Sequence, residues 1–271
     1  MSQDPFAGLK QRQREMWASF APNAMFTTPV AGHLVRFAGV APGEAVLDVG
    51  TGTGVVAVTA ARAGAQVTGL DLTPALLEHA RENAQIAGVS VNWQEGDAER
   101  LPFPDATFDI VVSQFGHMFA PRPELAVAEM RRVLKPGGRV AFSTWPPEHF
   151  VGRMFALMAR YAPPPPPGVS APPLWGNPAI VTERLAEGFD APFFSREVMY
   201  FPALSLGHFR AFMEQSIGPM QKTVHRLESA DPKALATLRA EFETLATPYF
   251  TDNQVHQHYL LTRAQAALRA A

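Results

Sequence analysis

Short runs rich in apolar residues alternate along the first half of the chain with stretches in which apolar residues recur at helical spacing. Runs of this kind are typical of strands that are buried on both faces. They occupy residues 45–49, 66–70, 89–94, 108–113 and 139–144. The helical pattern predicts helices at residues 9–20, 30–38, 55–63, 74–87 and 123–134. Strands that alternate with helices in this order predict a parallel sheet covered on both faces.

Glycine and proline mark the ends of these elements. Gly39, Gly64 and Gly88 each follow a predicted helix, as expected of residues that end helices in the left-handed conformation. Thr73 is expected to cap the helix that begins with Pro74.

After residue 145 the pattern changes, and the regular alternation of strands and helices ends. We expect helices at residues 150–161, 178–187, 206–217 and 232–247, and strands at 195–201 and 254–262. The helices between the last two strands are expected to form a cap inserted into the sheet domain. Five consecutive prolines, residues 163–167, are interpreted as a stiff connector.

Composition excludes several classes of function. The 271 residues have a formal net charge of -2 and no cysteine, which excludes thiolate catalysis, thiolate metal sites and disulfides. The chain has no basic patch typical of a nucleic-acid-binding protein and no apolar run that could span a bilayer, and its first 17 residues are polar and lack the apolar stretch of a secretory leader. We therefore expect a cytoplasmic protein, a monomer or a homodimer, that binds neither nucleic acid nor membrane.

The most informative segment is the turn after the first predicted strand. Asp48 ends the apolar run, and Gly50, Gly52 and Gly54 follow at alternate positions before a helix. Glycines allow a ligand to approach the backbone, and the new helix presents free N–H groups and a positive dipole end. The turn therefore predicts a nucleotide-like ligand.

Two other nucleotide sites fit this turn less well. Dinucleotide-binding folds use G-x-G-x-x-G, but Val55 stands where the third glycine belongs. A phosphate-binding loop of the Walker A type is excluded because no Gly-Lys-Ser/Thr follows.

Five motifs in order resemble those of class I S-adenosylmethionine-dependent methyltransferases. They are the glycine turn at residues 48–54, an acidic strand end at 69–72, the stretch 95–103, the strand 108–113 and the turn 132–138. The residues of the third and fifth motifs, D-A-E-x-L-P-F and R-V-L-K-P-G-G, resemble those of the subgroup that includes the ubiquinone and menaquinone biosynthesis methyltransferases. The resemblance implies a Rossmann-like, doubly wound α/β fold with a seven-stranded, mostly parallel sheet. It also implies three parts, a helical lid (1–44), the cofactor-binding core (45–145) and the remaining strands with their cap (146–271).

The resemblance implies a role for each residue of a cofactor site. Asp71 would accept hydrogen bonds from the ribose diol, and the turn would approach the methionine part of S-adenosyl-L-methionine. Leu72 would pack on the adenine, while Asp97 and the backbone of Ala98 would bind its edge. The predicted cofactor-binding residues are Asp48, Gly50, Thr51, Gly52, Gly54, Asp71, Leu72, Asp97, Ala98 and Gln114. Asp48 would support the ammonium group of the methionine, and Gln114 would lie near the reacting methyl group.

His117 is the candidate catalytic base, because it follows the fourth strand at the edge where ligands bind in such sheets. The alternative, a histidine that only packs between the cofactor and the loop, is equally compatible with the sequence. His256 and His258 face one side of the last strand, but no carboxylate partner is evident and no metal site is predicted.

The acceptor is expected to bind under the cap and the lid. Methionine and aromatic residues there would form an adaptable apolar pocket, although many of them belong to the core. They are Met154, Phe155, Leu157, Met158, Tyr161, Trp175, Phe209, Phe212, Met213 and Met220, with Trp17 and Met25 on the lid. We expect methyl transfer to a small, largely apolar acceptor, aromatic, quinol-like or polyketide-like, at oxygen, carbon or nitrogen. A non-catalytic cofactor-binding protein and, less favoured, a nicotinamide-dependent oxidoreductase are the alternatives.

Overall fold

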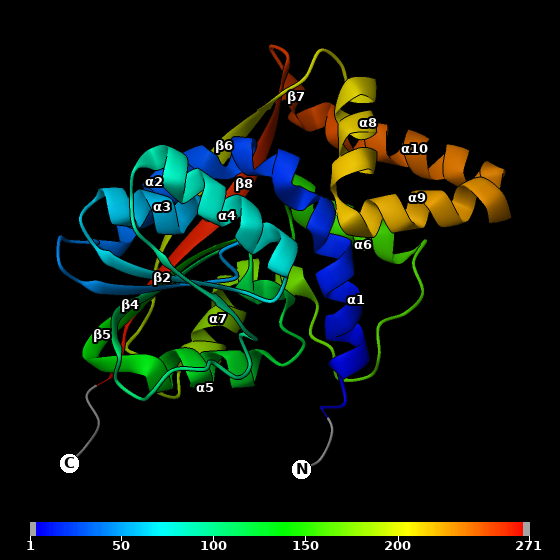
Figure 1. Ribbon diagram of the computed structural model, residues 1–271. Helices are drawn as coiled ribbons and strands as arrows, with labels where there is room; N and C mark the ends of the chain where they lie inside the picture. Colours follow the sequence, from blue (N-terminus) through cyan, green and yellow to red (C-terminus); the bar gives the residue numbers. More distant parts are fainter. Residues whose placement is uncertain (1–3, 268–271) are drawn as a thin grey trace.

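One mixed sheet lies at the centre of the fold in the computed structural model, which describes residues 4–267. Its strands are ordered β3-β2-β1-β4-β5-β8-β6, and the short β7 pairs with β8. The strands are β1 Ala45–Val49, β2 Gln66–Asp71, β3 Asn92–Glu95, β4 Phe108–Gln114, β5 Leu134–Thr144, β6 Phe193–Pro202, β7 Phe250–Thr251 and β8 Gln254–Gln265. The doubly wound α/β fold expected from the sequence is therefore confirmed (Figure 1).

The parallel strands place one end of each at a common edge. β1 pairs in parallel with β2 on one side and with β4 on the other. β2 also pairs in parallel with β3, and β4 pairs in parallel with β5. Strand order reverses between β1 and β4, and in open sheets of this kind ligands bind outside the carboxyl ends of the strands at that reversal. β8 runs antiparallel to both of its long neighbours, β5 and β6.

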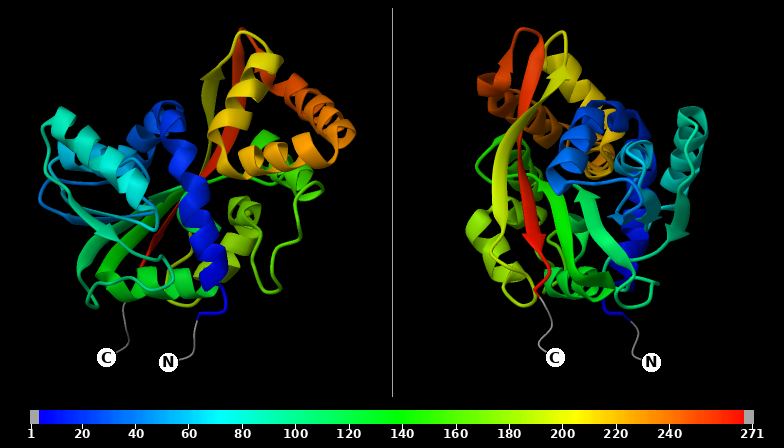
Figure 2. Two further views of the ribbon diagram at one scale, coloured as in Figure 1. Left: turned by 45° about the vertical axis from the view of Figure 1, so that its right-hand side comes forward. Right: turned by 90° about the vertical axis from the view of Figure 1, so that its left-hand side faces the viewer.

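Helices cover both faces of the sheet (Figures 1 and 2). α2 (Ala24–Ala38), α3 (Val55–Arg62) and α4 (Pro74–Ala87) form one layer. α5 (Pro123–Val133) and α7 (Pro178–Leu185) lie on the opposite face. Burial of apolar side chains holds each layer against the sheet. In α2, for example, Ala31, Leu34 and Ala38 have no solvent exposure.

Two further groups of helices lie over the carboxyl edge. The N-terminal α1 (Ala7–Trp17) and the 3-10 helix η1 (Ala18–Asn23) cross it from one side. The cap of α8 (Leu206–Ser216), α9 (Gly218–Ala230) and α10 (Pro232–Ala246) lies between β6 and β8 in the chain and covers the edge from the other side (Figure 2). α6 (Phe150–Ala159) packs below the cap, and the remaining 3-10 helices are η2 His117–Phe119, η3 Pro172–Gly176 and η4 Thr247–Tyr249.

The structure corrects several details of the sequence-based prediction. The sheet has eight strands rather than seven, because the two-residue β7 pairs with β8. α9 was not predicted, and α2 begins at Ala24 rather than at residue 30. Thr73 does not cap α4 through its side chain; its backbone N–H instead donates to the Asp71 carboxylate. No helix within residues 4–267 has the length and apolar character needed to cross a membrane.

Candidate functional site

A cavity lies at the carboxyl edge of the sheet, where strand order reverses. Its lining comes from the glycine turn after β1, the loops after β2, β3, β4 and β5, the N-terminal helices, α6, β6, the cap and β8. All but one of the residues predicted to bind the cofactor line it. The predicted residues that line it are Asp48, Gly50, Thr51, Gly52, Asp71, Leu72, Asp97, Ala98 and Gln114, and His117 lines it as well. The roles of these residues remain predictions, but the fold gathers them around one space.

The exception is Gly54, which does not line the cavity in the described part of the chain. Gly54 caps α3 with a φ of 81°, and a Cβ there would lie 2.8 Å from the Trp93 ring and 3.1 Å from Ala80 Cβ. Gly50 is also closed off, since a Cβ would lie 2.8 Å from Gly116 Cα. Around Gly52, in contrast, no protein atom beyond its chain neighbours lies within 4 Å of the Cβ position. The turn therefore leaves open space at Gly52, where a ligand could approach the backbone.

Asp48 is fully buried behind this turn. One of its oxygens, Oδ2, accepts hydrogen bonds from Thr51 Oγ1 at 2.6 Å and from the Ala57 N–H at 3.1 Å. The other, Oδ1, has no protein partner. Burial, opposed by these two hydrogen bonds, raises the pKa of Asp48 to about 7. A buried acceptor without a partner beside the turn fits the ammonium group of a methionine moiety.

Asp71 at the end of β2 holds the turn and faces the cavity at the same time. Its Oδ2 accepts from the Gly52 N–H and its Oδ1 from the Thr73 N–H, each at 2.8 Å. Burial raises the pKa of Asp71. Each carboxylate oxygen has a second lone pair, so both can still accept hydrogen bonds from a ribose diol. The residues present thus fit the cofactor that the resemblance implies.

Asp97, at the predicted adenine edge, is tied to the N-terminal helix. Its Oδ1 accepts from the Glu99 N–H at 2.9 Å, and its Oδ2 lies 2.7 Å from Lys10 Nζ of α1. Lys10 is buried and also contacts Asp4 and Glu99, each at 2.6 Å. Burial disfavours the charge of Lys10, but the three carboxylates outweigh it and raise its pKa.

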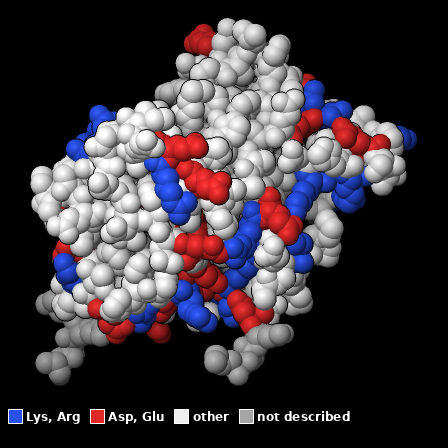
Figure 3. All heavy atoms as spheres, in the orientation of Figure 1, with Lys and Arg blue, Asp and Glu red and all other residues white. Residues whose placement is uncertain are grey.

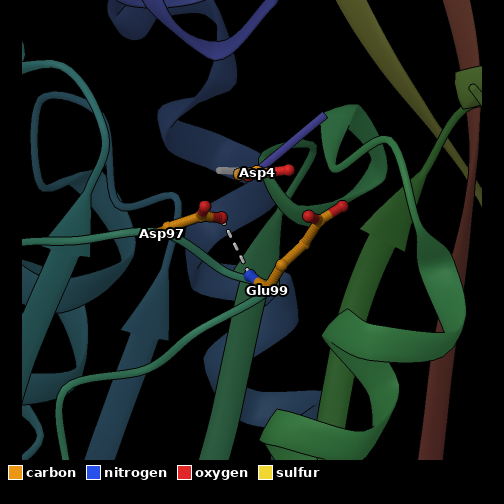
Figure 4. Close-up of side chains that lie close together, drawn as sticks. All are labelled: Asp4, Asp97 and Glu99. Atoms are coloured by element: carbon orange, nitrogen blue, oxygen red, sulfur yellow. Dashed lines mark hydrogen bonds between the residues drawn. The ribbon is translucent and has the colours of Figure 1, made fainter. Parts of the chain in front are cut away.

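The three carboxylates around Lys10 converge on one point (Figure 4). Arg122 adds a second positive charge, because its Nη2 lies 2.6 Å from Glu99 and 2.9 Å from Asp4. Acidic and basic side chains consequently intermingle on the surface beside α1 (Figure 3). Because Lys10 and Arg122 offset most of its charge, we interpret the acidic cluster as the anchor that holds α1 over the end of the cavity where the adenine is predicted to bind.

Gln114 is the last residue of β4, one residue beyond the end expected from the sequence, and it lines the cavity. Its place near the reacting methyl group stays a prediction. Its Nε2 donates to the Thr27 carbonyl of α2 at 3.1 Å, and its Oε1 is buried without a protein partner. The side chain therefore has a fixed direction at the cavity wall and one acceptor to spare.

His117 has its ring in the core, although the residue as a whole borders the cavity. The ring centroid lies 4.5 Å from that of Phe142 and 4.6 Å from that of Trp175. Neither ring nitrogen has a hydrogen-bond partner. Burial, with a smaller effect of the nearby Arg184 charge, lowers the pKa of His117 to about 3. This geometry favours the packing alternative over the catalytic base.

The other half of the cavity is apolar and comes from segments far apart in the sequence. Of the residues expected there, Trp17, Met154, Phe155 and Met213 line it. The other pocket residues expected from the sequence do not line the cavity but lie in the core or pack against it: Leu157, Met158, Tyr161, Trp175, Phe209, Phe212 and Met220. Met25 is 70% exposed and does not line the cavity either.

Several residues of this half were not predicted from the sequence. They are Gln13, Phe20, Asn23, Phe26, Phe119, Trp145, Val151, Met199, Phe201, Ile217 and Gln257. For most of them only an aromatic or aliphatic character was visible in the sequence, and that character is equally typical of core residues. Their common position follows from the packing of η1, the cap and the β6–β8 pair around one space.

His256 and His258 do face one side of β8, but each packs against an aromatic ring. His258 stacks on His149 at 4.3 Å and His256 lies 5.0 Å from Tyr200. Within residues 4–267, the one group of ionisable side chains with metal-ligand spacing is the cluster around Lys10.

Comparisons with known proteins agree with this geometry. A methyltransferase domain model matches residues 47–142. The uncharacterised protein Rv1405c of Mycobacterium tuberculosis is 36% identical over 95% of both chains. Demethylmenaquinone methyltransferase of Deinococcus radiodurans is 41% identical, but over 43% of this chain and 50% of its own length.

Solved structures share the fold at low sequence identity. A SAM-dependent methyltransferase from Thermotoga maritima has a TM-score of 0.52 and 17% identity, covering 93% of this chain and 99% of its own. The [4+2]-cyclase SpnF has a TM-score of 0.55 and 24% identity, covering 89% of this chain and 81% of its own. Similarity at this level shows the architecture of the domain and leaves the reaction open.

Proposed function

Because the chain belongs to the class I S-adenosylmethionine-dependent methyltransferases, we propose that it transfers a methyl group to a small, uncharged, largely apolar acceptor. S-adenosyl-L-methionine is the cofactor of this family and supplies an electrophilic methyl group on a sulfonium.

We assign the cofactor to the half of the cavity formed by residues 48–98. Asp71 binds the ribose hydroxyls, Asp48 Oδ1 accepts from the ammonium group, and the open space at Gly52 admits the methionine part. Leu72 and Ala98 flank the adenine. The support for these roles is the buried acceptor of Asp48 that lacks a partner and the open space around the Cβ position of Gly52.

One observation supports the nature of the acceptor. The ionisable side chains that line the cavity in residues 4–267 are Lys10, Asp48, Asp71, Asp97 and His117, and none belongs to the cap, β6 or β8. Lys10 is neutralised by carboxylates, and the ring of His117 lies in the core. A charged acceptor would lose its hydration without gaining a counter-charge, so the pocket selects neutral molecules.

Methyl transfer is an in-line displacement, for which the protein must mainly position two molecules and exclude water. The lid helix α1 with η1 and the cap cover the cavity on two sides. Since no described side chain that lines the apolar half can take a proton at neutral pH, the acceptor atom must be nucleophilic without a protein base, or must lose its proton to solvent.

The proposed function is tested with S-adenosylmethionine that carries an isotopically labelled methyl group. The protein is incubated with it and the small-molecule fraction of a cell extract, and we expect label in a product that partitions into organic solvent at neutral pH. At a cofactor concentration near the wild-type dissociation constant, the Asp71→Ala variant should yield several-fold less of this product. Binding of S-adenosylhomocysteine without any labelled product would instead indicate a non-catalytic binding protein, or another reaction on this fold such as the cyclisation for which SpnF is named.

A further inference from the structure

The two long strands at one end of the sheet continue beyond its carboxyl edge. β5 pairs with β8 only as far as Thr144↔Leu260, whereas β6 follows β8 out to Pro202↔Gln254. At roughly 3.3 Å per residue, the three residues from Leu260 back to Gln257 carry β8 about 10 Å past the end of β5. This two-stranded extension, residues 196–202 and 254–260, forms a wall of the acceptor half.

Where the inner face of the extension lines the cavity, it is apolar except for Gln257; Glu197, which pairs with Tyr259 on the same face, does not line the cavity. Side chains alternate along a strand, so Val255, Gln257 and Tyr259 share a face of β8. Met199 pairs directly with Gln257 and Phe201 with Val255. Met199, Phe201 and Gln257 line the cavity, while the Tyr259 hydroxyl lies 2.9 Å from His33 Nδ1.

Gln257 is a buried amide without a protein partner. It is 5% exposed, and within residues 4–267 its side chain makes no hydrogen bond to the protein. Other amides near the cavity or on the same strand are anchored. Asn23 donates to the Ser216 carbonyl, Gln114 to the Thr27 carbonyl and Gln265 to the Gly137 carbonyl. Neither polar atom of Gln257 is among the fully buried atoms that lack a partner, so the amide is accessible from the cavity, where a ligand can form hydrogen bonds with it.

The side chains around the acceptor half are strongly aromatic. Phe26 and Phe201 lie with their ring centroids 3.9 Å apart, and Trp17 lies 4.6 Å from Phe119. Flat rings fit between such side chains in offset-stacked or edge-to-face contact. An amide among them adds one donor and one acceptor without adding charge.

We propose that Gln257 determines acceptor specificity by hydrogen bonding to a carbonyl or hydroxyl oxygen on an aromatic acceptor, at the end remote from the methylated atom. This inference rests on the proposed function, because it assumes that the acceptor occupies the apolar half. The recognised oxygen is distinct from the atom that receives the methyl group, which must lie near Gln114 and the glycine turn. Gln257 thus positions the acceptor without taking part in the methyl transfer.

Direct binding tests this assignment without knowledge of the natural acceptor. The protein is saturated with S-adenosylhomocysteine, and calorimetry measures binding of 2-naphthol, 2-acetylnaphthalene and 2-methylnaphthalene. We expect the two oxygenated probes to bind about fivefold tighter than 2-methylnaphthalene, the ratio that corresponds to one net hydrogen bond. In Gln257→Leu this preference should vanish, while 2-methylnaphthalene binds as well as before or better.

The matched control is Gln254→Leu, which changes the same residue type on the same strand outside the cavity lining. It should retain the preference for oxygenated probes. Gln257→Met is the second variant, and because the amide makes no hydrogen bond to the protein, neither Gln257 variant should lower the melting temperature. A marked loss of stability in both would assign Gln257 a structural role and overturn the inference.

Two further outcomes are separable. If S-adenosylhomocysteine binds but the wild-type protein does not distinguish the probes, or Gln257→Leu still does, Gln257 does not select the acceptor. The proposed function stands in that case. If S-adenosylhomocysteine itself does not bind, the proposed function fails, and the inference fails with it.

Discussion

The two halves of the cavity are built in opposite ways. The cofactor half comes mainly from one contiguous stretch, residues 48–98, and uses backbone and carboxylate groups at strand ends. The acceptor half comes from the N-terminal helices, α6, β6, the cap and β8, and uses apolar side chains with one unpaired amide. A site that binds its ligand through the backbone depends on the fold itself, whereas the side chains of an apolar wall can be replaced without altering the fold. We infer that the fold determines which methyl donor binds, and that replaceable side chains determine which methyl acceptor binds.

The largest expected effect concerns the backbone of the cofactor half. Gly50→Ala would place a Cβ 2.8 Å from Gly116 Cα at a residue with a φ of 68°. The clash and the left-handed backbone together should lower the free energy of unfolding by about 2–5 kcal/mol. Thermal unfolding measures this loss.

Gly52→Ala is the matched variant, with a φ of 55° but no protein atom beyond its chain neighbours within 4 Å of its Cβ position. It should lose only about 1 kcal/mol of stability yet bind S-adenosylhomocysteine much more weakly. Unchanged affinity in calorimetry would show that the ligand does not approach the turn there.

The next effect concerns the carboxylate that faces the ribose. Asp71→Ala should weaken S-adenosylhomocysteine binding at least tenfold, on the order of 1.5–3 kcal/mol for hydrogen bonds to a charged group. Because Asp71 also holds the Gly52 and Thr73 N–H groups, Asp71→Asn, which retains one acceptor, should fall between the alanine variant and the wild type. A folded Asp71→Ala protein with wild-type affinity would remove Asp71 from the site.

Cofactor affinity should also depend on pH through Asp48, whose pKa is raised to about 7 in the unliganded protein. Only the ionised carboxylate attracts an ammonium group, so affinity should rise by up to about tenfold as the pH rises from about 6 toward about 8. Calorimetry with S-adenosylhomocysteine measures the slope, and Asp48→Asn should abolish it.

The stability of the unliganded protein should change in the opposite direction. A carboxyl group with a raised folded-state pKa binds more protons when folded, so its contribution to stability decreases as the pH rises from about 4 to about 7. A cofactor affinity that does not change with pH would show that Asp48 does not face the ammonium group.

The smallest effect is expected at His117. With both ring nitrogens unpaired and the ring between Phe142 and Trp175, His117→Phe should change stability by less than about 1 kcal/mol. Turnover in the labelled-product assay should stay within about twofold of the wild type, with the same pH profile. A fall of about a hundredfold with unchanged cofactor affinity would restore the catalytic base.

The sequence determined the order of elements and the cofactor half, because both depend on local signals. Apolar runs, glycine turns and helix starts lie within a few residues of one another, so the pattern alone places Asp48, Gly52 and Asp71 at a common edge of the sheet. Of the elements that were not predicted, the two-residue β7 carries too little pattern to be recognised. The helix α9 does carry the pattern, because Met220, Val224 and Leu227 recur at helical spacing, and it could have been predicted.

The acceptor half was decided only by the tertiary structure. Gln257 is one of many polar residues in the sequence, and nothing local distinguishes it from Gln254 three positions earlier. Packing of the cap and the N-terminal helices against the β6–β8 pair buries one amide and leaves the other at the end of the strand. Burial of a single side chain depends on segments more than 200 residues apart, such as η1 and β8, and no local period in the sequence records it.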